Sequence, residues 1–462
     1  MSKDKTAPKF ALGEEGLFDA TKLGTPKMIV LGLQHMFAMF GATVLVPILT
    51  GLSVSSTLLF AGLGTLLFHL LTGRKVPAFL GSSFAFLGGY AAIAANGEPE
   101  LLPYACLGVA CAGLLYVVLS ALIRAFGASK VMRFFPPIVT GPIIIAIGLT
   151  LASSAINNCS ANWWIALVAI IVVIACNIWG KGMIKIVPIL MGVLVSYIVA
   201  AIFGQVDFSG VRDAAWIGLP FKMENTVFSL FGGASTVNFG GAVVSKGSLI
   251  FTAIVTIVPI ALATMVEHIG DICAISSTTG RNYIEDPGLH RTMLGDGLAT
   301  TLASLFGAPA NTTYGENTGV LALTKVYDPR VIRIAAYFAV LFSFCPKFAA
   351  LISAMPAATI GGVSLILYGM ISAVGVRNIV ENRVDFTRSR NVIICALILG
   401  LALGINFSSA GAISFPVGSV TISLTGLAVA ALVGIILNAV FPGNDYKFDT
   451  KDTDPKYQTY KV

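Results

Sequence analysis

Residues 312–320 read Thr-Thr-Tyr-Gly-Glu-Asn-Thr-Gly-Val and lie in sequence that is otherwise typical of a membrane span. The stretch puts the carboxylate of Glu316 and the carboxamide of Asn317 at membrane depth. An ionisable group there is costly, so it usually has a function. The two glycines and the β-favouring residues before them argue against an unbroken helix, and broken backbone is tolerated in a membrane only where protein or a cavity covers it. We expect this stretch to line a binding site for a small polar molecule.

The composition indicates a polytopic protein embedded in a lipid bilayer. Of the 462 residues, 56% are hydrophobic and 11% are charged, whereas a soluble globular chain carries about 25% charged residues. The net charge of +7 is no sign of nucleic-acid binding, because the basic residues lie in the tails and in short loops. Six of the seven cysteines fall in hydrophobic runs, and no metal-ligand spacing occurs. We therefore expect no disulfide, no metal and no cofactor.

Hydropathy divides the chain into fourteen predicted spans. The third (about residues 76–95) and the tenth (about residues 311–325) are short and interrupted by glycine. An even number of spans puts both tails on one side of the membrane. In this topology 25 of the 29 Lys and Arg residues lie on the side of the tails and 4 on the opposite side. Such a bias marks the cytoplasmic side, so we expect both termini in the cytoplasm.

The chain also reads as two halves. Interrupted spans fall around residues 81–89 and 312–319, and proline-led spans open at Pro136 and Pro356. Both offsets are close to half the chain. Because each half has an odd number of spans, seven, the halves must be inverted relative to each other. Paired, glycine-broken spans in inverted halves indicate the midplane site of a transporter.

The predicted eighth span carries two acids, Glu267 and Asp271, on one helix face. Two carboxylates so close in a low dielectric cannot both stay ionised cheaply, which suits a proton carrier. Asp271 could instead lie at the cytoplasmic mouth in contact with water. His268 points elsewhere on the helix, and we expect it to be a packing or interface residue. Asp296 lies between two glycines near the start of the ninth span, predicted from about residue 293, and we expect it to be an N-cap.

Polar groups of the first span complete the candidate set. Gln34 and His35 lie in the middle of that span, where either could hydrogen-bond a neighbouring helix; His35 could also contact a ligand. Asn317 could cap a helix or support the site. A glycine at 315 would let backbone N–H groups approach a ligand closely.

The stretch Ser82-Ser83-Phe84 matters for its backbone. If the third and tenth spans begin extended and then turn helical, the N-termini of their half-helices face each other with unpaired N–H groups and a partial positive charge. Flanked by Glu267 and Glu316, such a site suits a flat molecule. The carboxylates would accept from ring N–H groups, and the backbone would donate to ring carbonyls. This pattern favours a nucleobase over an amino acid or a sugar.

On these residues the sequence resembles the nucleobase–ascorbate transporter family, and within it the uracil permeases of bacteria. The most specific match is the family signature Glu316-Asn317-x-Gly319-x4-Thr324-Lys325. Three further stretches match: Gln34-His35, Gly81–Phe86 and Glu267-His268-x-Gly270. Purine members often carry Gln at position 316, so the acid favours a pyrimidine. Asp271 departs from some uracil permeases, which have His there, and this puts the family's proton route in doubt.

The resemblance implies a fold and a function. The fold would be an all-α polytopic membrane protein with 14 transmembrane segments in two inverted seven-span repeats, with short β-strands breaking spans 3 and 10. The function would be proton-coupled import of uracil across the bacterial inner membrane by alternating access, in a homodimer joined through its gate domains. The implied boundaries are an N-tail (1–26), core (27–126 and 247–354), gate (127–204 and 355–441), an extracytoplasmic loop (205–246) and a C-tail (442–462).

The resemblance also implies roles for individual residues. Glu267 and Glu316 would bind the base, with Asp271 joining them in proton coupling. The pocket would be completed by Phe84, Gly315, Ser83, Tyr314, Ala42 and Tyr368, and supported by Gln34, His35 and Asn317.

Three alternatives remain. One is a xanthine or other purine symporter of the same family. Another is an anion exchanger or channel of the same architecture, which predicts a basic residue facing the pocket. The third is a membrane-embedded enzyme, for which the sequence offers acids but no nucleophile–base pair.

Overall fold

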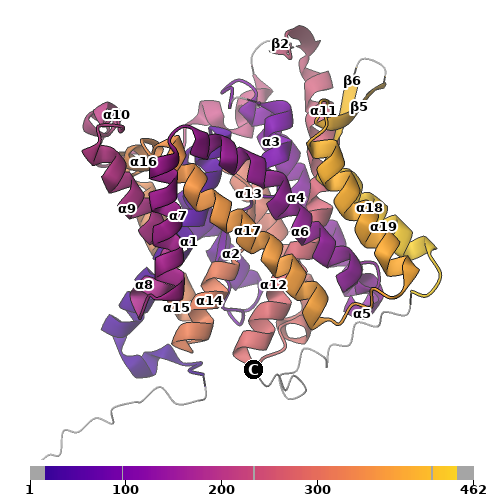
Figure 1. Ribbon diagram of the computed structural model, residues 1–462, viewed down its shortest axis with the longest axis horizontal. Helices are drawn as coiled ribbons and strands as arrows, with labels where there is room; N and C mark the ends of the chain where they lie inside the picture. Colours follow the sequence, from indigo (N-terminus) through magenta and orange to yellow (C-terminus); the bar gives the residue numbers. More distant parts are fainter. Residues whose placement is uncertain (1–15, 96, 233–234, 418–419, 445–462) are drawn as a thin grey trace, which may run out of the picture.

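The computed structural model describes residues 16–95, 97–232, 235–417 and 420–444 of a mostly helical chain (Figure 1). Among these residues, seven helices are long and apolar enough to cross a membrane. They are α1 (Thr25–Thr50), α2 (Val54–Leu71), α4 (Leu102–Phe126), α6 (Pro137–Ser160), the continuous α11–α12 (Lys246–Thr279), α17 (Ala357–Glu381) and α18 (Ser389–Asn406). Three shorter apolar helices accompany them: α7 (Trp163–Ile178), α9 (Pro188–Ile202) and α19 (Gly426–Val440). The chain is therefore a multi-pass membrane protein.

The two ends of the bundle carry different connections. In Figure 1 the short helices α5 (Ala128–Met132) and α8 (Met183–Ile186) lie at the lower end. Helix α10 (Ser209–Asp213) and strand β2 (Thr236–Phe239), which pairs with β3 (Ala242–Ser245), lie at the upper end. The hairpin of β5 (Ala412–Val417) and β6 (Val420–Thr425) also lies there and was not predicted. The lower helices carry two basic residues that we assigned to the cytoplasmic side, and α10 carries Arg212, assigned to the opposite side.

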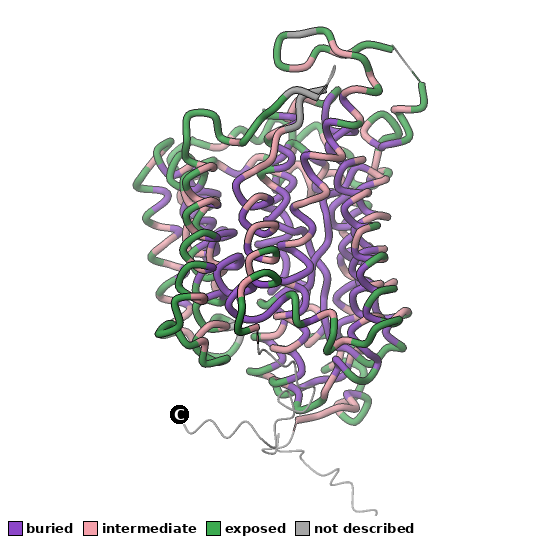
Figure 2. The backbone as a smooth tube through the Cα atoms, turned by 90° about the vertical axis from the view of Figure 1, so that its right-hand side faces the viewer, coloured by how far each residue is buried: buried purple, intermediate pink, exposed green. Residues whose placement is uncertain are grey.

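Burial separates the centre of the bundle from its rim. Figure 2 shows buried backbone running through the middle of the molecule, with exposed stretches on the outer helices and at both ends. Large apolar side chains are exposed along α7 and α9, among them Trp164, Trp179 and Ile198. In a membrane protein such a face contacts lipid tails, which are as apolar as the side chains themselves.

Two short strands lie at the centre. Strand β1 (Leu80–Ser82) pairs antiparallel with β4 (Asn311–Thr313), with Gly81 opposite Thr312. Helices α3 (Leu87–Ile93) and α14 (Gly315–Thr324) follow the two strands. A three-residue strand pair leaves backbone groups unsatisfied, and buried groups need partners.

Two threonine hydroxyls supply such partners. Thr65 on α2 accepts from the N–H of Leu80 at 2.9 Å and donates to its carbonyl at 3.2 Å. Thr300 on α13 (Leu289–Leu305) does the same for Asn311, at 3.2 and 2.9 Å. The strands are thus anchored to one helix of each half.

The predicted eleventh span differs from the structure at its end. We expected one helix to about residue 354, but α15 (Pro329–Ser343) and α16 (Pro346–Ser353) meet at a bend of 89°. Pro346 has no N–H for a helical hydrogen bond, and its ring disfavours a helical residue before it. The chain therefore turns there and starts a separate short helix.

Helices α6 and α17 pack against each other through glycines. A Cβ atom on Gly148 would lie 2.2 Å from the carbonyl oxygen of Tyr368, and one on Gly375 would lie 2.7 Å from that of Gly141. Only hydrogen fits at these points, so the two backbones approach closely, as small residues allow in membrane proteins. This packing also sets the position of Tyr368.

We expect the substitution Gly148→Ala to destabilise the protein. Alanine is the better helix former by about 1 kcal/mol, but here its methyl group overlaps backbone atoms, and such overpacking costs about 1–3 kcal/mol. The change should therefore lower the midpoint of thermal unfolding in detergent. Gly369→Ala on α17 is the matched control, because a Cβ there meets no atom within 4 Å. Equal midpoints for the two variants would contradict the packing argument.

Candidate functional site

Four acids from three helices gather at the centre of the protein. Glu267 and Asp271 lie on α12 (Ala261–Thr279), Asp296 on α13, and Glu316 in the first turn of α14. The carboxyl groups of the other three lie within electrostatic reach of Glu267. Asp296 is fully buried, whereas the other three acids are half-buried and so remain open to a ligand or to water.

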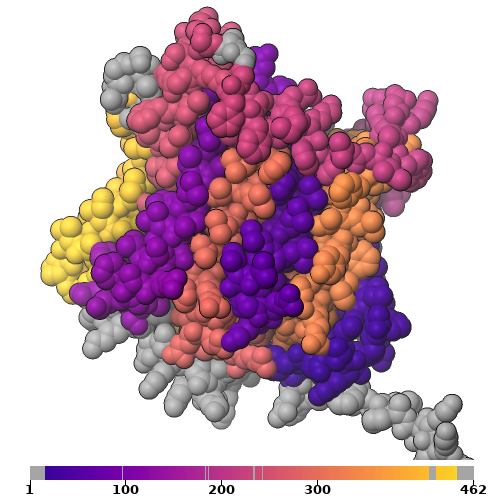
Figure 3. All heavy atoms as spheres, turned by 180° about the vertical axis from the view of Figure 1, so that it is seen from behind, coloured from indigo at the N-terminus to yellow at the C-terminus, as the bar shows by residue number. Residues whose placement is uncertain are grey.

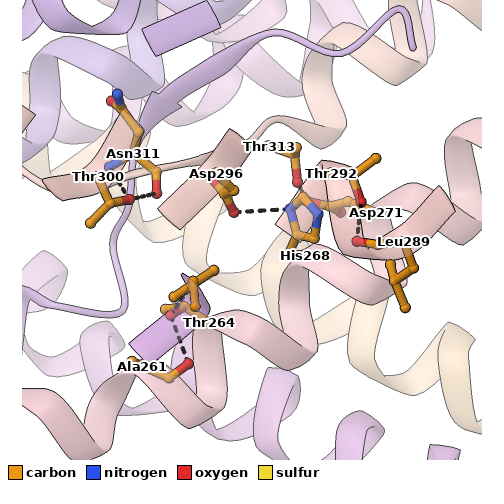
Figure 4. Close-up of polar contacts among 11 residues, drawn as sticks. Ala261, Thr264, His268, Asp271, Leu289, Thr292, Asp296, Thr300, Asn311 and Thr313 are labelled. Atoms are coloured by element: carbon orange, nitrogen blue, oxygen red, sulfur yellow. Dashed lines mark hydrogen bonds and ion pairs between the residues drawn. The ribbon is translucent and has the colours of Figure 1, made fainter. Parts of the chain in front are cut away.

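Asp271 is tied to the strand pair. The hydroxyl of Thr313, the last residue of β4, donates to Asp271 Oδ2 at 2.7 Å (Figure 4). A freely hydrated acid at the mouth of the protein, one of our two expectations, does not describe this half-buried, hydrogen-bonded group. Thr313 was missed as a site residue, because nothing in the sequence indicates which acid its hydroxyl meets.

The first turn of α14 is open at its N-terminus. Tyr314 is the N-cap, and no side chain caps the helix there. Gly315 is exposed, and a Cβ atom there would meet nothing within 4 Å. Backbone N–H groups of a first turn have no intrahelical partner, so this turn can donate to a ligand beside Glu316.

Several predicted pocket residues lie in one apolar cluster. Phe84, Ala42, Tyr314 and Tyr368 are all buried within it. The ring of Phe84 meets that of Tyr368 edge to face, with centroids 5.6 Å apart, which joins the region after β1 to α17. Ser83 is buried and donates its N–H to the carbonyl of Ala310 at 2.8 Å.

Tyr314 is turned into the strand pair. Its hydroxyl donates to the carbonyl of Ser82 at 2.8 Å. Its ring occupies the place where a Cβ on Gly81 would lie, only 2.5 Å from the ring carbon Cζ. Gly81 is therefore needed for close approach, and Tyr314 locks the two strands together.

Asn317 does not cap α14, contrary to one of our two expectations. It lies in the third position of the helix, and its Nδ2 donates to the carbonyl of His35 at 3.0 Å and lies 3.2 Å from His35 Nδ1. The contact joins α14 to α1 at the residue that follows Glu316. Gln34, beside His35, is also buried.

His268 and Asp296 form a contact that we did not predict. Both side chains are 0% exposed, and His268 Nδ1 lies 2.9 Å from Asp296 Oδ2 (Figure 4). The N-cap expected at Asp296 is wrong, since α13 already begins at Leu289. The flanking glycines serve packing instead: a Cβ on Gly297 would lie 2.4 Å from Tyr116 Cβ. An acid between two small residues inside a span was the signal that could have indicated a buried pair.

Removing one partner of this pair should destabilise the protein. We expect Asp296→Ala to cost about 1–3 kcal/mol, because the buried imidazole of His268 is left without its polar partner. Asp296→Asn should cost less, since an amide can still hydrogen-bond the imidazole. Thermal unfolding in detergent measures both, with the exposed Asp213→Ala as control. An Asp296→Ala midpoint equal to that of the control would contradict a structural role for the pair.

Comparison with known proteins places the chain in a family. The model of the permease family, Xan_ur_permease, matches residues 26–411. The chain belongs to this family. Among curated relatives, the permease is 40% identical to the uracil permease of Bacillus caldolyticus over 90% of its own chain and 92% of the relative. It is 39% identical to the probable uracil permease of Haemophilus influenzae (90% and 94%), and 38% identical to the putative pyrimidine permease RutG of Escherichia coli K12 (89% and 88%).

Solved structures with the same fold are more distant in sequence. The permease matches the transmembrane domain of the cyanobacterial bicarbonate transporter BicA with a TM-score of 0.58 at 12% identity, over 92% of this chain and 99% of that one. It matches the murine anion transporter Slc26a9, described in its inward-facing state, with a TM-score of 0.59 at 12% identity, over 90% and 68% of the chains. At this identity the likeness concerns the fold alone.

Proposed function

We propose that this permease imports uracil. The observation that carries the proposal is the pairing of Glu267 with Glu316, within electrostatic reach of each other, beside the uncapped and open first turn of α14. Uracil is flat and presents ring N–H donors and carbonyl acceptors. Glu316, as a carboxylate, and Glu267, through the carbonyl oxygen of its protonated carboxyl group, accept from the ring N–H groups. Backbone N–H groups near Gly315 donate to the ring carbonyls. Relatives named uracil permeases, similar over nearly their whole length, support the same substrate.

The remaining roles follow from the positions of the side chains. Phe84 and Tyr368 enclose the ring, with Ala42, Ser83 and Tyr314 forming the wall around the strand pair. His35, Gln34 and Asn317 support Glu316 from behind through the contact of α14 with α1. Hydrogen bonds to a charged group are stronger than neutral ones, so ionised Glu316 supplies most of the specificity.

Proton coupling is the second part of the proposal. Glu267 takes a proton from the outside, and uracil then binds. The core moves against the gate, and the proton and uracil are released to the cytoplasm. Coupling requires that the proton and uracil favour the same state. Asp271, held by Thr313 and within electrostatic reach of both Glu316 and Arg377, is the next acceptor on this route.

We further propose fourteen spans in two inverted repeats. Contacts between elements recur with a shift of seven spans, which supports this arrangement. Helix α4 packs on α13 as α15 packs on α2, and α7 packs on α9 as α18 packs on α19. Pro136 and Pro356 each precede the first residue of a helix, α6 and α17, in extended conformation. Spans 3 and 10 are then β1 with α3 and β4 with α14.

The same arrangement gives the domains and their orientation. Spans 1–4 and 8–11 form the core, spans 5–7 and 12–14 the gate, with the boundaries implied by the family resemblance. Both termini lie in the cytoplasm of a bacterium, where the basic residues concentrate. In a homodimer, part of the apolar face of the gate contacts the second copy, and the rest contacts lipid.

Uptake of radiolabelled uracil into proteoliposomes tests the substrate. Unlabelled uracil and thymine should compete in this assay, while xanthine and hypoxanthine should not. Competition by xanthine alone would instead favour a purine symporter of the same family. An anion exchanger on this fold predicts anion-dependent flux, but the acids gathered at the centre repel anions. Flux that depends on chloride or bicarbonate and not on uracil would contradict the proposal.

A further inference from the structure

A short segment before α1 crosses the lower end of the molecule. We call residues Leu17–Leu23 the N-terminal clasp. The N–H of Leu17 donates to the carbonyl of Lys325 at 2.7 Å, and its carbonyl accepts from the N–H of Tyr327 at 2.8 Å. These bonds form a parallel β-bridge with Val326. The clasp is therefore joined, backbone to backbone, to the residues directly after α14. Figure 3 shows the indigo N-terminal residues beside the orange residues of the α15 region at the lower right.

Polar and apolar side chains fasten the clasp to the start of α15. The N–H of Ala20 donates to Asp328 Oδ2 at 2.7 Å, and Arg330 Nη1 donates to Asp19 Oδ1 at 3.0 Å. The hydrogen bond from the Thr21 hydroxyl, helped by Arg330, lowers the pKa of the Asp19 carboxyl, so it is charged at neutral pH. Ala20 is packed with buried apolar residues of both segments, Val326 and Val331 among them.

Phe18 extends these contacts to a second helix. Its ring lies against that of Tyr327, with centroids 5.3 Å apart, and the guanidinium of Arg281 lies 3.6 Å above its centroid. Arg281 directly follows Gly280, the C-cap of α12. One side chain of the clasp thus touches residues that follow α12 and α14, the two helices that carry the proposed substrate-binding acids.

The need for such an anchor follows from the length of α14. The helix has 10 residues, which corresponds to about 15 Å at about 1.5 Å per residue, about half the thickness of the hydrocarbon core of a bilayer. Its direction therefore depends on what holds its two ends. The N-terminal end is held by β4, and the C-terminal end by the bridge between Leu17 and residues 325–327. A tilt of α14 would displace Glu316 relative to Glu267.

We propose that the N-terminal clasp positions the substrate site, with Phe18 as its positioning residue. It fixes the relative position of the cytoplasmic ends of α12 and α14, so that Glu267 and Glu316 bind uracil with the same geometry throughout the transport cycle. The clasp stays closed while the core moves as a unit. This inference rests on the proposed function, because it needs both acids to contact the substrate.

A double-mutant cycle tests the positioning role. Phe18→Ala and Arg281→Ala should each raise the KM for uracil uptake about 2- to 5-fold, as expected for the loss of one exposed cation–π contact, with kcat changed less than about 2-fold. The double variant should resemble the single ones, because both changes remove one shared contact. Lys22→Ala, an exposed position of the clasp, is the control. Arg281 is also exposed, so its variant should fold even if Phe18→Ala does not.

Three results separate the possible failures. Unchanged KM in both single variants, with wild-type uptake intact, would overturn the positioning role. A fall of kcat at constant KM would also overturn it, because it would assign the clasp to the moving step. Absence of uracil uptake by the wild type would instead contradict the proposed function.

A cross-link tests whether the clasp stays closed. Leu17→Cys with Val326→Cys places two thiols at bridge partners, and oxidation should leave uracil uptake within about 2-fold of the reduced protein. Uptake that oxidation abolishes and a reductant restores would overturn the proposal, because the clasp would then have to open in each cycle.

Discussion

Glu316→Gln is expected to lower kcat/KM for uracil uptake by about 10- to 100-fold. The substitution keeps the size of the side chain and removes its charge. A hydrogen bond to a charged group contributes about 1.5–3 kcal/mol, and each 1.4 kcal/mol is a factor of ten in affinity. Initial rates of radiolabelled uptake and equilibrium binding to the purified protein measure the loss.

The control for this change is Glu285→Gln, an exposed acid in the connection between α12 and α13. It should transport as the wild type does. A shift of the Glu316→Gln variant toward xanthine would agree with the charge at position 316 selecting pyrimidines. Unchanged uracil affinity would remove Glu316 from the binding site.

Glu267→Gln is expected to abolish accumulation of uracil driven by a proton gradient. Glutamine cannot take up and release a proton, so the transport cycle loses its coupling group. The response to the gradient should therefore be lost. Uracil binding should fall by less than about 10-fold, because the amide oxygen of glutamine can replace the neutral carboxyl as acceptor and a neutral hydrogen bond contributes about 0.5–1.5 kcal/mol.

Comparing uptake with and without an imposed gradient separates the loss of proton coupling from the loss of uracil binding. Wild-type protein should take up more uracil when the outside is acidic, and Glu267→Gln should not respond. Glu224→Gln, an exposed acid in the connection between α10 and α11, is the control. A Glu267→Gln variant that still accumulates uracil in response to the gradient would place the proton on another group, with Asp271 the first to examine.

The sequence indicated candidate site residues where acids or glycine interrupt hydrophobic runs. Glu316 and Glu267 are acids in hydrophobic runs, and such acids are rare without a function. Glycine at 315 interrupts a span, and in the structure a helix begins there. Local sequence is enough for these inferences, because each depends on a residue type that is unusual in a hydrophobic span.

Contacts between distant segments could not be predicted in the same way. Asp296 and His268 lie on different helices, and the partner of a buried acid depends on how two helices face each other. The same holds for Thr313 with Asp271, and for the N-terminal clasp, whose polar composition indicates only a tail. The predicted N-cap at Asp296 is wrong because α13 begins earlier than its glycines suggest. Pro346 was visible in the sequence, but its bend was missed because the apolar run continues through it.

Uptake of uracil into proteoliposomes under an inward proton gradient tests the central claim most directly. We predict saturable uptake that rises when the outside is acidified and falls when a protonophore collapses the gradient. In liposomes that contain Glu316→Gln, kcat/KM should be about 10- to 100-fold lower. Uracil uptake that does not depend on the gradient, or that matches protein-free liposomes, would contradict the central claim.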